Sequence, residues 1–378
     1  MRDSHSADLF AVVTGGGTAG HVLPALAIAE ALVAAGHEPS TIHYVGAARG
    51  IEARLLPATP FGHTFLDVVG LQRRRGLHLV TENLRFVPKL VAAVWQARRL
   101  LRRLRPRVVV SVGGYASLAA VLAARLRRIP VVVVSYDRRP GRASQLAARF
   151  AAACAVAFPD SPLPHAVVTG APVRQVVLDV DRVRDRDDAR HRLGLPLDRF
   201  VVAVTGGSQG SAAINAAVEA YVAAHVDDSG LAVRHIVGER FVAGTRAGGA
   251  SKMDDGVVHQ VLGFDDDLAS TYAAADLLVG RGGASTVAEV AVTGIPAILV
   301  PWSGAAEDHQ TENVAWLATR GAAISLSEES LDTLGAVIDR LRLDPAELAR
   351  LSAAARDAGQ QHRSGNLAQL IERVAAQS

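Results

Sequence analysis

The stretch Asp276–Pro301, DLLVGRGGASTVAEVAVTGIPAILVP, predicts a strand, a turn, a helix and a second strand in immediate succession. An apolar run ends at Gly280, and the glycine pair after the next arginine can form a tight turn. Ser285 is the predicted N-cap of a helix that ends at Gly294, and a proline begins the next strand. A strand, helix and strand joined this closely predict a parallel βαβ unit.

The rest of the chain repeats this alternation. Short β-branched runs bounded by Gly and Pro, without strict alternation of apolar and polar residues, are typical of strands buried on both faces of a parallel sheet. Helical patterns lie between them, at Pro24–Ala35, Ala212–Ala224 and Thr286–Val292. The predicted strands are Leu9–Val13, Thr41–Val45, Val108–Val112, Val131–Val134, Ala155–Phe158, Ala166–Thr169, Phe200–Thr205, Val233–Val237, Val258–Leu262, Leu277–Val279 and Ala297–Val300.

The length and the restart of the pattern predict two domains. The chain has 378 residues, 49% of them hydrophobic and 20% charged, which is enough for two packed cores and excludes a disordered chain. The strand series restarts near residue 170, so we expect two α/β, Rossmann-like parallel-sheet domains at 1–170 and 171–355. A last helix is expected at roughly Pro345–Ala376, with its part at 356–378 packing back on the first domain. The Asp- and Arg-rich stretch 179–194 is expected to form a solvated helix near the junction.

Composition excludes several other classes of protein. The single cysteine, Cys154, rules out a disulfide framework and a cysteine-based zinc site. The polar start does not predict a signal peptide, and no stretch approaches the ~20 apolar residues of a membrane span. A net charge of +3 does not indicate nucleic acid as a partner. We therefore expect a protein that is soluble or bound to a membrane surface.

Two glycine-rich loops join a predicted strand to a predicted helix, at Thr14–His21 and Thr205–Ser211, and a glycine pair begins at Gly113. Such loops allow close approach of a ligand, and the helix N-terminus offers N–H groups to anions. Taken alone, the first loop also fits a dinucleotide fingerprint or a simple tight turn. An NAD enzyme would need an acidic residue after the second strand, and Tyr44–Ala47 contains none, which counts against it.

Polar residues after the later strands indicate a sugar or nucleotide site. Glu289 lies in an early turn of the predicted helix, where its carboxylate could accept both hydroxyls of a ribose or simply be favoured by the helix dipole. The segment Asp308–Asn313 could contact a sugar or form an ordinary polar loop. Three consecutive aspartates, Asp265–Asp267, suggest a metal site, but a helix-capping loop is the favoured interpretation.

These motifs together resemble the MurG family of glycosyltransferases, and the resemblance extends over nearly the whole chain. Two departures matter, in the HEQN and GGYxSGP segments, and Ala19 replaces a glycine of the first loop. The family's HEQN segment appears here as Val134–Asp137, with Asp137 at the asparagine position, where it could accept a sugar hydroxyl. The family's GGYxSGP segment appears as Gly113–Ala119. The matching segments are Gly16–Leu26 for GGTGGHxxPxL, Gly170–Arg174 for GNPVR, Gly206–Gly210 for GGSQG with Asn215 following, Arg281–Glu289 for RxGAxTxxE, and Asp308–Gln310 with Asn313 for DxQ…N.

The resemblance implies the GT-B fold, in which two Rossmann-like domains face each other across a cleft. It implies inverting, metal-independent transfer of N-acetylglucosamine from UDP-N-acetylglucosamine to the C4 hydroxyl of the muramyl sugar of lipid I, giving lipid II for peptidoglycan synthesis, cell shape and cell division. No cofactor is expected. A MurG-like transferase with another acceptor, or a non-catalytic nucleotide-sugar-binding paralogue, stays open because the HEQN segment is altered.

Site residues follow from the same resemblance. His21 is the expected general base, Glu289 binds the ribose, and Gln310 binds the sugar hydroxyls. Arg174 and Ser208, with helix N-termini, are expected to stabilise the phosphates. The other predicted substrate-binding residues are Thr18, Ala19, Gly20, Asp137, Ala284, Ser285, Thr286, Val287 and Ala288.

A lipid acceptor implies a membrane-facing patch, which we expect in Leu71–Arg107. Arginines near apolar and aromatic side chains suit anionic headgroups, although an amphipathic helix with solvated arginines fits the same pattern. This predicts a peripheral protein at the cytoplasmic face of the cell membrane, with lipid I and an anionic surface among its partners. The predicted patch comprises Leu77, Leu79, Phe86 and Trp95, and the predicted core positions of the same segment are Val87, Leu90, Val94, Ala97 and Leu101.

Overall fold

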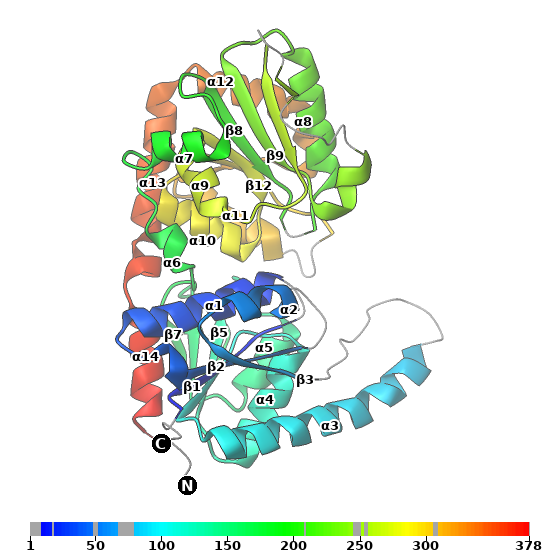
Figure 1. The fold of residues 1–378 in the computed structure, drawn as a ribbon, viewed down its shortest axis with the longest axis vertical. Coiled ribbons are helices and arrows are strands. Elements are labelled where there is room, and N and C mark those ends of the chain that lie inside the picture. Colours follow the sequence, from blue (N-terminus) through cyan, green and yellow to red (C-terminus); the bar gives the residue numbers. More distant parts are fainter. Residues whose placement is uncertain are drawn as a thin grey trace. The chain divides into compact units, whose positions relative to one another are not determined.

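The chain folds into two compact units, Met1–Gln175 with Ser364–Ser378 (unit 1) and Val176–Arg363 (unit 2) (Figure 1). The structure is a computed structural model that describes residues 9–16, 19–47, 52–66, 79–207, 209–244, 251–252, 256–304 and 309–377. The predicted boundary at 170 lies close to the observed division. Residues 356–363 belong to unit 2 rather than to the returning helix, because helix α13 (Pro345–Gly359) packs on α10 (Ala284–Thr293).

Unit 1 is a doubly wound sheet of seven parallel strands in the order β3-β2-β1-β4-β5-β6-β7. Helices α3, α4 and α5 pack into a core on one face, and α14 packs beside α1. The strands are β1 (Ala11–Thr14), β2 (Ile42–Ala47), β3 (Gly62–Leu66), β4 (Val108–Ser111), β5 (Val131–Ser135), β6 (Ala153–Val156) and β7 (Ala166–Val168), and the helices α1 (Ala19–Ala34), α2 (Glu52–Leu55), α3 (Leu79–Leu104), α4 (Tyr115–Leu126), α5 (Arg142–Ala148) and α14 (Asn366–Ala375).

Unit 2 has a second seven-stranded sheet, in the order β10-β11-β9-β8-β12-β13-β14, in which only the β10–β11 pair of the described strands is antiparallel. Its main core lies between the sheet and helices α8, α12 and α13. The strands are β8 (Phe200–Thr205), β9 (Leu231–Ile236), β10 (Ser251–Lys252), β11 (Val258–Leu262), β12 (Leu277–Arg281), β13 (Ala297–Val300) and β14 (Ile324–Ser325). The remaining helices are α6 (Gln175–Leu178), α7 (Arg186–Leu193), α8 (Ala212–Ala224), α9 (Leu268–Ala274), α11 (His309–Ala318) and α12 (Leu334–Arg342).

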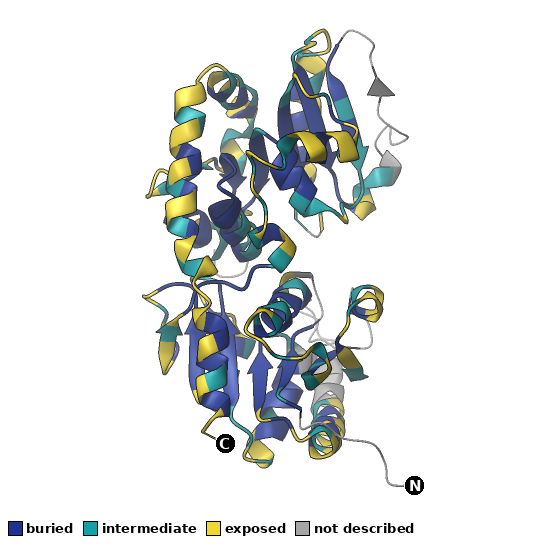
Figure 2. Cartoon of the chain, turned by 60° about the vertical axis from the view of Figure 1, so that its left-hand side comes forward, coloured by how far each residue is buried: buried dark blue, intermediate teal, exposed yellow. Residues whose placement is uncertain are grey.

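The central strands of both sheets are buried on both faces, as their apolar runs predict (Figure 2). Cys154 lies in β6 with no exposed surface, and burial raises the pKa of its thiol to about 11. The sequence patterns missed β3, β10 and β14, which are edge strands or only two residues long. The predicted last helix is two helices, α13 and α14, because Gly365 between them has a left-handed φ of 71°.

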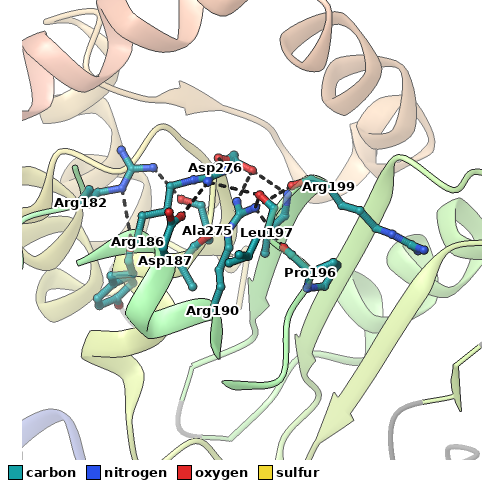
Figure 3. A network of polar contacts seen from close by, with 12 residues as sticks. Arg182, Arg186, Asp187, Arg190, Pro196, Leu197, Arg199, Ala275 and Asp276 are labelled. Carbon is teal, nitrogen blue, oxygen red and sulfur yellow. Dashed lines mark hydrogen bonds and ion pairs between the residues drawn. The ribbon is translucent and has the colours of Figure 1, made fainter. Parts of the chain in front are cut away.

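An ion pair between the buried Arg190 of α7 and the half-buried Asp276 joins this helix to the start of β12 (Figure 3). Arg190, which has no exposed surface, donates from Nη2 to Asp276 Oδ2 at 2.7 Å. Its other nitrogens donate to the carbonyl oxygens of Ala274, Pro196, Leu197 and Arg199 at 2.8 to 3.2 Å. The expectation that the charges of 179–194 are solvated is therefore wrong for Arg190.

Replacing Arg190 by Met should destabilise unit 2 by about 3 kcal/mol or more, because Asp276 and several carbonyl groups lose their buried donor. Hydrogen exchange of the β8 and β12 amides in increasing urea would measure the loss. Arg186→Met is the matched control, since Arg186 pairs with the same carboxylate at the longer distance of 3.6 Å and is partly exposed. Equal stability of the two variants would contradict this interpretation of the ion pair.

Candidate functional site

The first glycine loop of unit 1 is held from two sides by buried tyrosines. It follows β1 and ends in the first turn of α1. The Tyr44 hydroxyl donates to the carbonyl oxygen of Gly15, and the Tyr136 hydroxyl donates to that of Gly20. Burial raises the pKa of both tyrosines, so both remain protonated donors. Tyr136 occupies the glutamine position of the family's HEQN segment, and this contact could not be seen in the sequence.

His21 lies beside the glycine pair Gly113–Gly114, which follows β4. A Cβ placed on Gly113 would lie 3.4 Å from His21 Nε2 and 3.4 Å from Ser144 Oγ, so both side chains converge on this backbone. Burial lowers the pKa of His21, while the negative charges of Asp137 and Glu52 act in the opposite direction. The imidazole is therefore neutral near pH 7 and able to accept a proton.

The second glycine loop, in unit 2, connects β8 to the N-terminus of α8. Ser211 is the N-cap of α8, and its Oγ accepts from the backbone N–H of Ile214 at 3.3 Å. The buried Arg281, at the end of β12, donates from Nη2 to Ser211 Oγ at 2.6 Å and also pairs with Glu328. The N-terminus of α8 therefore favours a negatively charged ligand at this loop, while the charge of Arg281 is balanced by Glu328.

Helix α10 carries the predicted ribose-binding carboxylate. The Tyr272 hydroxyl donates to Glu289 Oε2 at 2.7 Å, which orients the carboxylate. Helix α10 begins at Ala284 with Gly283 as its N-cap, so the prediction that Ser285 caps the helix is wrong. Ala284, Val287 and Ala288 are buried, whereas Ser285 and Thr286 are half-buried and closer to solvent.

The remaining predicted site residues lie in both units. Gln310, at the start of α11, accepts from the backbone N–H of Trp302 at 3.0 Å. Arg174 lies in unit 1, where its Nε donates to Glu30 Oε1 at 2.7 Å. Gly20 is exposed and Asp137 is half-buried. Thr18, Ser208 and Asp308 lie outside the described residues, as does the side chain of Ala19.

The aspartate triplet is a capping loop, as predicted. Asp267 is the N-cap of α9 and accepts from the backbone N–H of Ser270 at 3.2 Å. Asp265 pairs with Arg234 at 3.1 Å. The described residues contain no group of three or more His, Cys, Asp or Glu side chains suited to a metal ion.

An apolar groove of about 320 Å³ lies between α3 and α4 in unit 1. Trp95 is 55% exposed there and Leu126 is 63% exposed, and the Arg98 guanidinium lies 5.2 Å from the centre of the Trp95 ring system. Of the predicted patch, only Trp95 has a described side chain, because Leu77 and the side chains of Leu79 and Phe86 lie outside the described part. The groove is lined by Leu90, Val91, Val94, Trp95, Leu122, Arg125 and Leu126.

The contribution of α4 to the groove, through Leu122 and Leu126, was missed in the sequence analysis. The prediction of core positions on α3 holds for Ala97 and Leu101, which are buried, and in part for Leu90 and Val94, which pack against the core. The side chain of Val87 lies outside the described residues. In the part of the chain that the structure describes, each helix is too short or too polar to span a bilayer.

Comparison with known proteins identifies two family models and many close relatives. The glycosyltransferase family 28 N-terminal domain matches residues 11–156, and the C-terminal domain of the same family matches residues 201–371. Relatives from Clavibacter sepedonicus and Acidothermus cellulolyticus are 38% and 37% identical, each over 97% of this chain and over 96% and 98% of their own lengths. Both are named UDP-N-acetylglucosamine–N-acetylmuramyl-(pentapeptide) pyrophosphoryl-undecaprenol N-acetylglucosamine transferase.

Solved structures agree with the predicted fold class. The crystal structure of Acinetobacter baumannii MurG has a TM-score of 0.70 and 28% identity, covering 96% of this chain and 99% of that one. CalG4, the calicheamicin glycosyltransferase, has a TM-score of 0.62 at 16% identity over 98% of both chains and is similar in fold. The two Rossmann-like sheets and these neighbours confirm the predicted GT-B class.

Replacing Asp137 by Asn should shift the acid limb of the kcat/KM profile to lower pH. Asp137 raises the pKa of His21, so its loss leaves an imidazole that protonates only at lower pH. The weaker base should lower kcat by about tenfold. Initial rates over a range of pH would measure both effects in wild type and variant.

Asp160→Asn is the matched control, because Asp160 is a unit 1 carboxylate whose pairing partner is the partly exposed Arg138 at 2.6 Å. Its profile should match that of the wild type. A rise in KM for Asp137→Asn with an unmoved acid limb would mean that Asp137 contacts substrate only.

Proposed function

Because the chain belongs to the MurG family of UDP-N-acetylglucosamine–N-acetylmuramyl-(pentapeptide) pyrophosphoryl-undecaprenol N-acetylglucosamine transferases, we propose that it transfers N-acetylglucosamine from UDP-N-acetylglucosamine to lipid I, giving lipid II. The observation that carries this proposal is identity of 38% over nearly the full length of both chains. The glycine loops of the two units, each between a parallel strand and a helix, support it.

Unit 2 holds the donor in this proposal. Glu289, oriented by Tyr272, accepts the ribose hydroxyls, and Gln310 contacts the N-acetylglucosamine hydroxyls. The diphosphate lies at the N-termini of α8 and α10, with Ser208 as a hydroxyl donor. Arg281 holds Ser211, the N-cap of α8, and Arg174 would contact a phosphate by exchanging Glu30 for it.

Unit 1 supplies the base and the acceptor site. The C4 hydroxyl of the muramyl sugar attacks the anomeric carbon while its proton passes to His21. The bond from the anomeric carbon to the diphosphate oxygen breaks, and UDP leaves with the electron pair, so the configuration inverts. Backbone N–H groups and arginines stabilise the charge of UDP in place of a divalent cation. Thr18, Ala19 and Gly20 border the acceptor diphosphate and the donor sugar.

A second candidate is a MurG-like transferase with a different acceptor. The observation that favours it is Tyr136, which stands at a position of the altered HEQN segment and uses its hydroxyl to hold the carbonyl oxygen of Gly20. The histidine and asparagine of that segment, which in the family usually face the acetylated sugar, are replaced here by Val134 and Asp137. A non-catalytic paralogue would bind UDP-sugar and give no product with any acceptor.

A transfer assay with labelled UDP-N-acetylglucosamine and a lipid I analogue tests the proposal. Product should form equally with and without chelator, and His21→Ala should lower kcat by at least about 100-fold while UDP affinity is unchanged. Product only after addition of metal would contradict the mechanism. A folded, UDP-binding protein that uses another acceptor but not lipid I would establish the second candidate instead.

The groove between α3 and α4 is proposed to face the membrane, making the protein peripheral at the cytoplasmic surface. Exposed Trp95 and Leu126 would enter the acyl boundary, while Arg98 and Arg125 contact anionic headgroups. This arrangement would bring unit 1 to the lipid-linked acceptor.

Replacing Leu126 by Ser should weaken binding to vesicles of phosphatidylglycerol and phosphatidylcholine by roughly tenfold, because an exposed leucine no longer enters the bilayer. Vesicle co-sedimentation would measure it, with UDP binding as a check on folding. Leu343→Ser is the matched control, since Leu343 is an 84% exposed leucine of unit 2. Equal loss for both variants would contradict the proposed membrane face.

A further inference from the structure

Two histidines on neighbouring strands of unit 2 begin a hydrogen-bonded chain that ends beneath the second glycine loop. His259 Nε2, on β11, lies 3.4 Å from Nδ1 of His235, on β9, and the two rings stack with centroids 5.6 Å apart. His235 Nε2 lies 3.1 Å from Asn215 Oδ1. The Asn215 amide donates from Nδ2 to the carbonyl oxygen of Val237 at 3.0 Å. The proposed reaction uses none of these groups.

One backbone carbonyl fixes the direction of every hydrogen bond in this chain. The Val237 carbonyl can only accept, so the NH₂ group of Asn215 faces it and the amide oxygen faces His235. His235 must then donate from Nε2, which leaves Nδ1 to accept from His259. His235 must be neutral to accept at Nδ1, and burial lowers its pKa to about 3 and also lowers the pKa of His259.

The hydrogen-bonded series ends at the Val237–Gly238 peptide, which packs directly against the glycine loop. Gly210 has a φ of +68°, and a Cβ on it would lie 2.2 Å from the carbonyl oxygen of Val237. A Cβ on Gly238 would lie 2.7 Å from Gly210 Cα. Gly210 in turn donates its N–H to the carbonyl oxygen of Gly207 at 2.9 Å. A rotation of the Val237 peptide would therefore displace the loop.

We propose that His235 is a positioning residue for binding of the nucleotide diphosphate. Its hydrogen bond to Asn215 holds the Val237–Gly238 peptide, and through this peptide the loop segments Gly206–Gly207 and Gln209–Gly210, in the shape that receives the phosphates. His259 fixes the required tautomer of His235 from the outer side. This inference rests on the proposed function, which assigns the donor diphosphate to the loop.

Calorimetry with UDP and with uridine tests the role, because only UDP contacts the loop through phosphate. His235→Leu removes the donor and keeps an apolar side chain, so the Kd of UDP should rise about tenfold while that of uridine is unchanged. His235→Gln should restore most of the UDP affinity, since its Nε2 can donate to Asn215. His43→Leu is the matched control, a histidine of unit 1 bonded to Thr64 at 2.8 Å, and should change neither Kd.

The outcomes separate this inference from the function on which it rests. If His235→Leu lowers stability but binds UDP as tightly as the wild type, the positioning role is overturned and the proposed function is not. A wild-type protein that binds UDP no tighter than uridine would overturn the donor site itself. If His235→Leu does not fold, ring NMR of the ¹⁵N-histidine wild type decides the matter. UDP but not uridine should shift the His235 Nε2–H signal, and no shift with UDP would contradict the proposal.

Discussion

The carboxylate of Asp276 aligns the two central strands of unit 2 at their first residues. Its Oδ2 accepts from the N–H of Val201 and from Arg190, both at 2.7 Å, while its own N–H donates to the Val201 carbonyl at 2.8 Å. The parallel pairing of β8 with β12 continues from there to the carboxyl ends of both strands. The second glycine loop follows β8 at that end, and Arg281 is the last residue of β12. A slip of one residue would displace those loops by about 3.3 Å. The site in unit 2 therefore depends on the ion pair of Arg190 with Asp276 at the other end of the strands.

Unit 1 fixes its own loop by different means. The side-chain hydroxyls of Tyr44 and Tyr136 donate to two carbonyl groups of the loop. Two opposing effects act on the pKa of His21: burial favours the neutral ring, and the charge of Asp137 favours the protonated one. A base in this balance can take a proton at neutral pH and is made stronger by the neighbouring carboxylate. Through Tyr136, the altered HEQN segment supports the loop with a side chain that differs from that of the family.

Much of the fold could be predicted from local sequence, because β-branched runs between glycines and prolines mark buried parallel strands. Phe200–Thr205 and Val258–Leu262 were predicted to the residue, and so was helix Ala212–Ala224. Partners distant in the chain could not be predicted: Arg190 appeared solvated because Asp276 follows it 86 residues later. The same reason hid the contact of Tyr136 with Gly20 and the part of α4 in the apolar groove.

The site roles were predicted from motifs, and the geometry adds the residues that hold them. Glu289 was expected from its place in a helix, whereas its partner Tyr272 carries no motif. Cys154, the single cysteine of the chain, is sealed inside the β6 strand with a weakly acidic thiol. The native protein is therefore inert to maleimide dyes and nitroxide reagents, and cysteines introduced singly on the surface of each unit would accept such labels without background, ready for distance measurements between the units during turnover.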